Sequence, residues 1–171
     1  RAGDGMKRAP RPNGYRDTWA GDLDASRAGS EARVAGWVHR RRDHGGLIFV
    51  DLRDRSGIVQ LVFHPEQADA FAAAERLRPE HVLSASGQVV RREPENVNPN
   101  IPTGEIEVQV AELVTLAEAD TPPFPLDEDT PVDEMLRLRH RMLDLRREHM
   151  RDALVLRDAV IFTMRESLAA E

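Results

Sequence analysis

The sequence predicts a mainly β protein in which a five-stranded barrel is followed by a proline-rich acidic linker and C-terminal α-helices. Residues 48–52 and 105–110 alternate strictly between apolar and polar, the period of half-buried strands. Proline and acid dominate residues 118–134, a composition typical of a boundary between domains. Beyond residue 135 the apolar residues recur at helical spacing. The predicted parts are a disordered extension (1–16), the barrel (17–117), the linker (118–135) and the helices (136–171).

The composition excludes several classes of protein. With 171 residues the chain holds one good core and the start of a second. The absence of cysteine removes disulfides, thiolate catalysis and cysteine-based zinc sites. No apolar run approaches the roughly 20 residues needed to cross a membrane, and no apolar stretch follows the basic N-terminus as in a secretory signal. We therefore expect a cytoplasmic protein that has no membrane partner.

The charge pattern is less decisive. The net charge of −6 argues weakly against nucleic acid as a partner, because phosphate is bound by positive potential. Much of the acid, however, lies between residues 118 and 134, so a basic patch elsewhere is compatible with it. That these charge runs merely coat solvated faces is an alternative that composition leaves open. The positive clusters are Arg40–Arg42, Arg53 with Arg55, Arg91–Arg92, and residues 137–151.

The first three strands form a meander. The strand Val34–Val38 leads into three arginines and a turn at residues 43–46, where two glycines accept positive φ. In the strand at residues 48–52, the residues Ile48, Val50 and Leu52 share one face, so Phe49, Asp51 and Arg53 fall on the other. A turn at residues 54–57 then leads to the strand Ile58–Phe63, whose face opposite the core carries Gln60.

A helix and two more strands complete the barrel. The helix is expected at residues 66–77, between two prolines, and a strand at residues 81–90 follows with a bend at Gly87. The last strand is residues 105–110. Three meandering strands, a helix and two strands is the order of the OB-fold, a Greek-key barrel whose exposed sheet face binds oligonucleotides. A small β-barrel without a ligand is the alternative.

The C-terminal part is expected to contain one helix at residues 136–148 and a second from about His149. In the second helix, apolar residues recur on one face from Met150 to Leu168. Such a face needs a partner, which is either another subunit or a further part of the protein.

Phe49 and Gln60 are the leading candidates for binding residues. An exposed aromatic ring on an OB sheet is a platform on which an unpaired base stacks, although a loop that covers Phe49 would make it part of the core. The amide of Gln60 both donates and accepts, which suits the edge of a base, but a strand glutamine is often only solvated. Arg40, Arg41 and Arg42 at the neighbouring strand end, and Arg53 on the outward face, suit phosphates or base edges.

Glu105 and Glu107 complete the candidates on the outward face. A carboxylate accepts from base amino groups and repels phosphate, so it would specify a base rather than merely attract RNA. No sequence motif of a catalytic site is present, and the six histidines lack metal-ligand spacing. We therefore predict neither a catalytic residue nor a metal site in this chain.

Three segments resemble one family. The segments GWVHRRRDHGGLIFVDLRDRSGIVQLVF (36–63), PTGEIEV (102–108) and LRLRHRMLDLRR (136–147) are similar to bacterial-type aspartyl-tRNA synthetases of class II. The helix that follows resembles the start of the family's motif 1, a dimer interface. Lysyl and asparaginyl synthetases share the OB domain, but the first and third segments are most similar to the aspartyl enzyme.

The resemblance implies that Phe49 stacks on a base of the G-U-C anticodon of tRNA-Asp, and that Arg42, Gln60 and Glu107 contact anticodon bases. It implies a homodimer that joins aspartate to tRNA through aspartyl-adenylate with ATP and Mg²⁺. The family's catalytic motifs 2 and 3 are absent from these residues, so the chain is expected to bind RNA without catalysing and to hold no cofactor.

His44 and Glu95 depart from the pattern of members restricted to tRNA-Asp, which commonly carry leucine and a lysine there. The histidine resembles the relaxed enzymes that also charge tRNA-Asn, which makes these two residues candidates for tRNA discrimination. A solvated turn histidine is the plain alternative. A stand-alone single-strand-binding OB module is the rival function.

Overall fold

The computed structural model describes residues 13–126 and 130–169. They form two compact units, and the boundary along the chain falls between Thr121 and Pro122. Most of the predicted N-terminal extension, residues 1–12, lies outside the described residues, as do residues 127–129 of the linker. The described end of that extension is ordered by a short bridge between Asn13 and Arg16.

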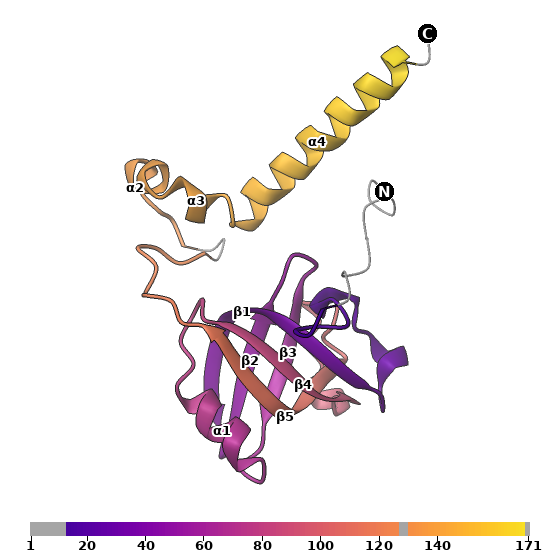
Figure 1. Ribbon diagram of the computed structural model, residues 1–171, viewed down its shortest axis with the longest axis vertical. Helices are drawn as coiled ribbons and strands as arrows, with labels where there is room; N and C mark the ends of the chain where they lie inside the picture. The colour runs from indigo at the N-terminus through magenta and orange to yellow at the C-terminus, as the bar shows by residue number, and fades with distance from the viewer. Residues whose placement is uncertain (1–12, 127–129, 170–171) are drawn as a thin grey trace. The chain divides into compact units, whose positions relative to one another are not determined.

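The first unit is a closed five-stranded barrel (Figure 1). Its strands are paired in the order β1-β2-β3-β5-β4, and all neighbours run antiparallel except β3 and β5. This is the strand order of the OB-fold, so the predicted fold class is confirmed. The strands are β1 (Glu31–His44), β2 (Leu47–Arg53), β3 (Ile58–Phe63), β4 (Val82–Arg91) and β5 (Ile106–Ala117).

The alternation in the sequence sets which side chains fill the barrel. Ile48, Val50 and Leu52 of β2 are at most 2% exposed, whereas Phe49 and Asp51 between them are half-buried on the outer face. The same holds for β5, where Ile106, Val108 and Val110 enter the core. Because a one-residue slip would turn Phe49 inward, this phase is the feature on which the functional site depends.

Several elements differ in length from the prediction. β1 continues through the three arginines to His44, because each of these residues pairs with β2, for example Arg42 with Phe49. β5 likewise runs on to Ala117 by pairing with β4. Apolar patterning underestimates β1 because its end is polar on both faces, and β5 because the strict alternation of residues 105–110 does not continue beyond Val110. The helix α1 (Ala68–Glu75) is shorter than predicted.

Gly87 marks the predicted irregularity in β4. The register with β5 shifts between Ser86 and Gly87. A Cβ atom at Gly87 would overlap the carbonyl oxygen of Gln109, so the two strands approach more closely than any other residue permits.

The second unit is helical, with α2 (Glu134–Arg139), α3 (Arg141–Asp144) and α4 (Glu148–Ala169). The prediction of one continuous helix at residues 136–148 was wrong. His140 has non-helical backbone angles (φ −113°, ψ 45°) and separates α2 from α3. The break lets the buried carboxylate of Asp144 accept hydrogen bonds from Arg137 and Arg141. Within the described residues, no helix combines the length and the apolar character that crossing a membrane requires.

Candidate functional site

The outer face of the barrel carries a hollow of about 860 Å³. It brings together five of the predicted site residues: Arg42, His44, Phe49, Gln60 and Glu107. They come from β1, β2, β3 and β5, which are consecutive in the sheet, so strand pairing places them side by side. The remaining lining residues are Asp43, Leu47, Val62, His64, Arg92, Asn96 and Asn98.

Phe49 supplies the aromatic surface of the hollow. Phe49 on β2 is paired with Arg42 on β1 and with Val62 on β3. Val62 is only 1% exposed although it lies on the outer face, whereas Phe49 remains half-buried. The Phe49 ring is therefore seated on an apolar floor and retains exposed surface, as base stacking requires.

A chain of hydrogen bonds crosses the hollow beside Phe49. Nη2 of Arg42 donates to Oδ1 of Asp51 at 2.8 Å and to Oε1 of Gln60 at 3.3 Å. Nε2 of Gln60 in turn donates to Oε2 of Glu107 at 3.2 Å. Gln60 is only 8% exposed, so its amide is held at both ends rather than solvated.

Glu107 and Arg92 form the far end of this chain. Nε of Arg92 lies 3.6 Å from Oε2 of Glu107 and donates to the carbonyl of Ile106 at 2.9 Å. Burial raises the pKa of Glu107, although Arg92, His64 and Gln60 act to lower it. Burial likewise lowers the pKa of Arg92 despite the attraction of Glu107. For both groups the loss of water therefore outweighs the attraction between them.

Two buried nitrogen atoms in the lining are still unsatisfied. Nη2 of Arg92 and Nε2 of His64 have no hydrogen-bond partner in the part of the chain that the structure describes. Unpaired buried polar atoms are rare in native proteins, and a bound water, ion or ligand is one explanation for them. The hollow therefore combines an apolar ring, a fixed carboxylate and unmet hydrogen-bonding capacity.

The other predicted residues lie outside the lining. Arg40 is exposed on β1. Arg41 donates to the carbonyl of Ala74 and pairs with Asp43, so it joins β1 to α1. Nη2 of Arg53 donates to both carboxylate oxygens of the buried Glu80. Glu95 is exposed in the 3-10 turn Pro94–Asn96, beside the lining residue Asn96.

His64 and Arg92 were missed as site residues, as was Asp51. A signal for His64 is available in the sequence, because residues 60, 62 and 64 share one face of an extended strand. Arg92 is harder to find, since its place beside Glu107 depends on how β4 and β5 pair. Asp51 is a polar residue within β2, whereas His64 and Arg92 directly follow β3 and β4, and apolar patterning assigns no function to any of these positions.

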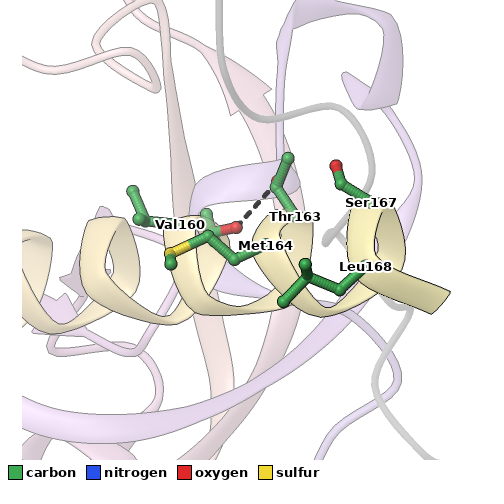
Figure 2. Close-up of a pocket in the computed structure, with 6 residues that line it drawn as sticks. Val160, Thr163, Met164, Ser167 and Leu168 are labelled. Carbon is green, nitrogen blue, oxygen red and sulfur yellow. Dashed lines mark hydrogen bonds between the residues drawn. The ribbon is translucent and has the colours of Figure 1, made fainter. Parts of the chain in front are cut away.

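A second hollow, shown in Figure 2, lies along α4. All six lining residues belong to this helix, and the hydroxyl of Thr163 is satisfied by the carbonyl of Ala159 at 2.9 Å. This hollow offers a mainly apolar surface, and we assign no catalytic role to its lining residues. In the described residues no group of three or more histidine and acidic side chains is placed to hold a metal ion.

Glu107→Gln is expected to stabilise the barrel in a pH-dependent way. Because the folded protein holds the Glu107 proton more tightly than the unfolded chain, the stability contributed by this group is present at low pH and lost as pH rises through the raised pKa. Glutamine resembles the protonated form, so its advantage over the native residue should be largest above the raised pKa and shrink as the pH falls toward the ordinary value of 4.5. Urea unfolding of both proteins across this range measures the difference, and a constant difference would contradict the assignment.

The comparisons with known proteins agree with this architecture. A family model described as OB-fold nucleic acid binding domain matches residues 32–116. The aspartate–tRNA(Asp/Asn) ligase of Rubrobacter xylanophilus is 58% identical over 157 residues, which cover 92% of this chain and 26% of that relative. The corresponding ligase of Moorella thermoacetica is 52% identical over 156 residues, with 91% and 26% covered. The chain thus spans about a quarter of the length of the curated relatives it matches.

A solved structure has the same architecture. The asparaginyl-tRNA synthetase of Pyrococcus horikoshii, complexed with asparaginyl-adenylate, superposes with a TM-score of 0.74 at 26% identity. The match covers 88% of this chain and 33% of that one. The similarity therefore includes residues on both sides of the boundary between the two units.

Proposed function

Since this chain belongs, through residues 32–116, to the family of OB-fold nucleic acid binding domains, we propose that it is the anticodon-binding part of an aspartate–tRNA ligase. The observation that carries the proposal is the hollow itself. It unites an aromatic platform, Phe49, with side chains suited to base edges, Arg42, Gln60 and Glu107. The relatives that share 50% or more of its residues over this region are aspartate–tRNA(Asp/Asn) ligases.

The geometry suits single-stranded RNA. A base stacks on Phe49, and the edges of that base and its neighbours meet the charged side chains along the wall. Glu107 offers a carboxylate to a base amino group and so favours some bases over others. Arg42 and Arg92, by contrast, attract the phosphates of the RNA backbone as well as the bases. A donor or acceptor on the RNA would satisfy Nη2 of Arg92 and Nε2 of His64.

The test is a titration of the chain with stem-loops. A stem-loop with the G-U-C anticodon should bind in a salt-dependent manner, because its phosphates release counterions to the arginines. A stem-loop of the same stem with an unrelated anticodon serves as the control and should bind more weakly. Equal binding of the two would instead favour a stand-alone single-strand binder, the rival function.

For the whole protein we propose the ligase reaction, in which aspartate is activated as aspartyl-adenylate with ATP and Mg²⁺ and transferred to tRNA-Asp. This chain would contribute recognition rather than chemistry. In its described residues no acidic cluster is placed to hold Mg²⁺, so ATP and the metal would bind in the three quarters of the relatives' length that the chain does not span. A cytoplasmic location and a homodimer are part of the same proposal.

The support for a homodimer is α4. None of its described residues is buried, although it carries large apolar side chains, among them Leu154, Phe162 and Leu168. A second copy of the whole protein would cover this face. In isolation the helix should fray at its C-terminal end, because most of the stability of helices in proteins comes from tertiary packing and no described residue of α4 is buried.

We further propose that the whole protein charges both tRNA-Asp and tRNA-Asn. His44 lines the hollow at the end of β1 and is exposed. An imidazole donates or accepts according to its tautomer, so it tolerates either C or U at the last anticodon base, where the two tRNAs differ. Glu95 adds no positive charge to the neighbouring turn. The relatives named aspartate–tRNA(Asp/Asn) ligase support this reading.

His44→Leu is expected to lower the charging rate of tRNA-Asn by about three- to tenfold, the value of roughly one hydrogen bond, and to leave tRNA-Asp nearly unchanged. Aminoacylation of both transcripts by the whole protein measures the ratio. Glu66→Gln, an exposed substitution outside this hollow, is the matched control. A wild-type protein that ignores tRNA-Asn would end the proposal.

A further inference from the structure

Asp51 is an acidic residue in the middle of a surface that is proposed to bind RNA. It lies on the outer face of β2, between the positions of Phe49 and Arg53, and its side chain is 18% exposed. A carboxylate at such a place repels phosphate and weakens binding unless it does something else. It is absent from the lining of the hollow, yet it touches a residue of that lining.

Its contact is with Arg42. The side chain of Arg42 is 44% exposed near the end of β1, where a long side chain would otherwise sample many rotamers. A single nitrogen, Nη2, is shared between Asp51 and Gln60. Among the described residues, Nε and Nη1 make no hydrogen bond, so two donors remain for a ligand while the group is held in one orientation.

The orientation passes from Arg42 to Gln60. Because Arg42 donates to Oε1 of Gln60, the amide nitrogen must point away from the guanidinium and toward Glu107, to which it donates. The reversed amide would place two donors against each other and leave the Glu107 carboxylate opposite an oxygen. The carboxylate of Asp51 on β2 thus fixes the orientation of Arg42 on β1, and through it the orientation of the Gln60 amide toward Glu107.

We propose that Asp51 is a positioning residue for RNA recognition, which holds Arg42, and through it the amide of Gln60, in the orientation that meets the bases. The inference rests on the proposed function of the hollow. Asp51 itself touches no RNA and is required only because Arg42 is present.

A double-mutant cycle on the chain tests this dependence, with the G-U-C stem-loop as the probe. Asp51→Ala should weaken binding by about three- to tenfold. In a protein that already carries Arg42→Ala, the same substitution should weaken binding by less than about twofold, because nothing remains to be positioned. Asp51→Asn keeps an acceptor for Arg42 and should stay within about threefold of the wild type. Glu93→Gln removes an exposed acid outside both the network and the lining of the hollow, and it is the control for net charge.

The sign of the effect separates positioning from simple electrostatics. If Asp51 acts only as a nearby negative charge, Asp51→Ala tightens binding, as Glu93→Gln does, and the proposal is overturned. Equal losses with and without Arg42 overturn it as well. A wild-type chain that fails to bind the stem-loop would refute the proposed function instead, which keeps the two failures distinct.

A second readout needs no RNA. The side-chain amide of Gln60 in a ¹H–¹⁵N spectrum should shift in Asp51→Ala and in Arg42→Ala alike, and stay near its native position in Asp51→Asn. If Asp51→Ala unfolds the barrel, the Asp51→Asn and Arg42→Ala spectra together with the Asp51→Asn affinity decide the question. An unmoved Gln60 amide in Arg42→Ala would contradict the linkage.

Discussion

Replacing Phe49 with alanine is expected to weaken binding of the G-U-C stem-loop by roughly 1–3 kcal/mol, which is about 5- to 150-fold, the value of stacking one base on an aromatic ring. Phe49 is half-buried on the open face of β2, next to Val62, and it belongs to the lining of the hollow. Alanine removes the ring without disturbing the core, because the core residues are its neighbours Ile48 and Val50.

The matched variant is Phe49→Trp, which keeps a stacking surface and should retain most of the affinity. Tyr15→Ala removes an aromatic side chain that is 58% exposed elsewhere on the same unit, so it controls for nonspecific loss of aromatic surface. Isothermal titration of the four proteins measures the effect. An unchanged affinity of Phe49→Ala, with its thermal unfolding intact, would contradict the role of the ring.

Asp144→Ala is expected to melt the α2–α3 segment, with a loss of roughly 1.5–3 kcal/mol in the free energy that keeps it closed, the usual value of a hydrogen bond to a charged group whose partners are partly exposed. Asp144 is fully buried and accepts from Arg137 at 2.7 Å and from Arg141. Arg147, only 5% exposed, lies close enough to contribute to its field. Without the carboxylate, these guanidinium groups lose their shared partner and repel one another, although water reaches the partly exposed side chains of Arg137 and Arg141.

The same site predicts a pH dependence of definite sign. Hydrogen bonding from Arg137 holds the pKa of Asp144 below its ordinary value of 3.8. Because the unfolded segment binds the proton more tightly, the stabilisation is present above the ordinary value and is lost as pH falls through the lowered pKa. Hydrogen exchange of residues 134–147 measures both effects. Asp152→Ala, an exposed acid on α4 paired with Arg151, is the control, and equal protection in Asp144→Ala would contradict the account.

The outer face of the barrel was predictable because one strand has a clear phase. The alternation in residues 48–52 placed Phe49 outward, and strand order then brought Arg42, Gln60 and Glu107 to the same face. An alternation of apolar and polar residues with a period of two is visible in the sequence without any knowledge of tertiary contacts. The C-terminal helices were harder to predict, because the break at His140 accompanies a long-range contact of Asp144 with Arg137 rather than a proline or glycine.

The hydrogen-bond chain through the site was not predictable from the residues taken singly. Gln60 by itself resembles a solvated strand glutamine, and its 8% exposure follows from having Arg42 and Glu107 at its two ends. Asp51 and Arg92 were likewise assigned no role, because their partners lie on other strands. Registers between strands, which decide such contacts, are set by the pairing of the whole barrel.

The most direct test of the central claim is to map the RNA on the protein. In ¹H–¹⁵N spectra of the chain titrated with the G-U-C stem-loop, we predict that the largest shifts fall on the backbone amides of Phe49, Gln60 and Glu107 and on the side chains of Arg42 and Arg92. Residues of α4 should change little. Saturable shifts confined to α4, or to the separate hollow lined by Tyr15, Arg33 and Ser86, would show that the hollow around Phe49 is not the RNA-binding surface.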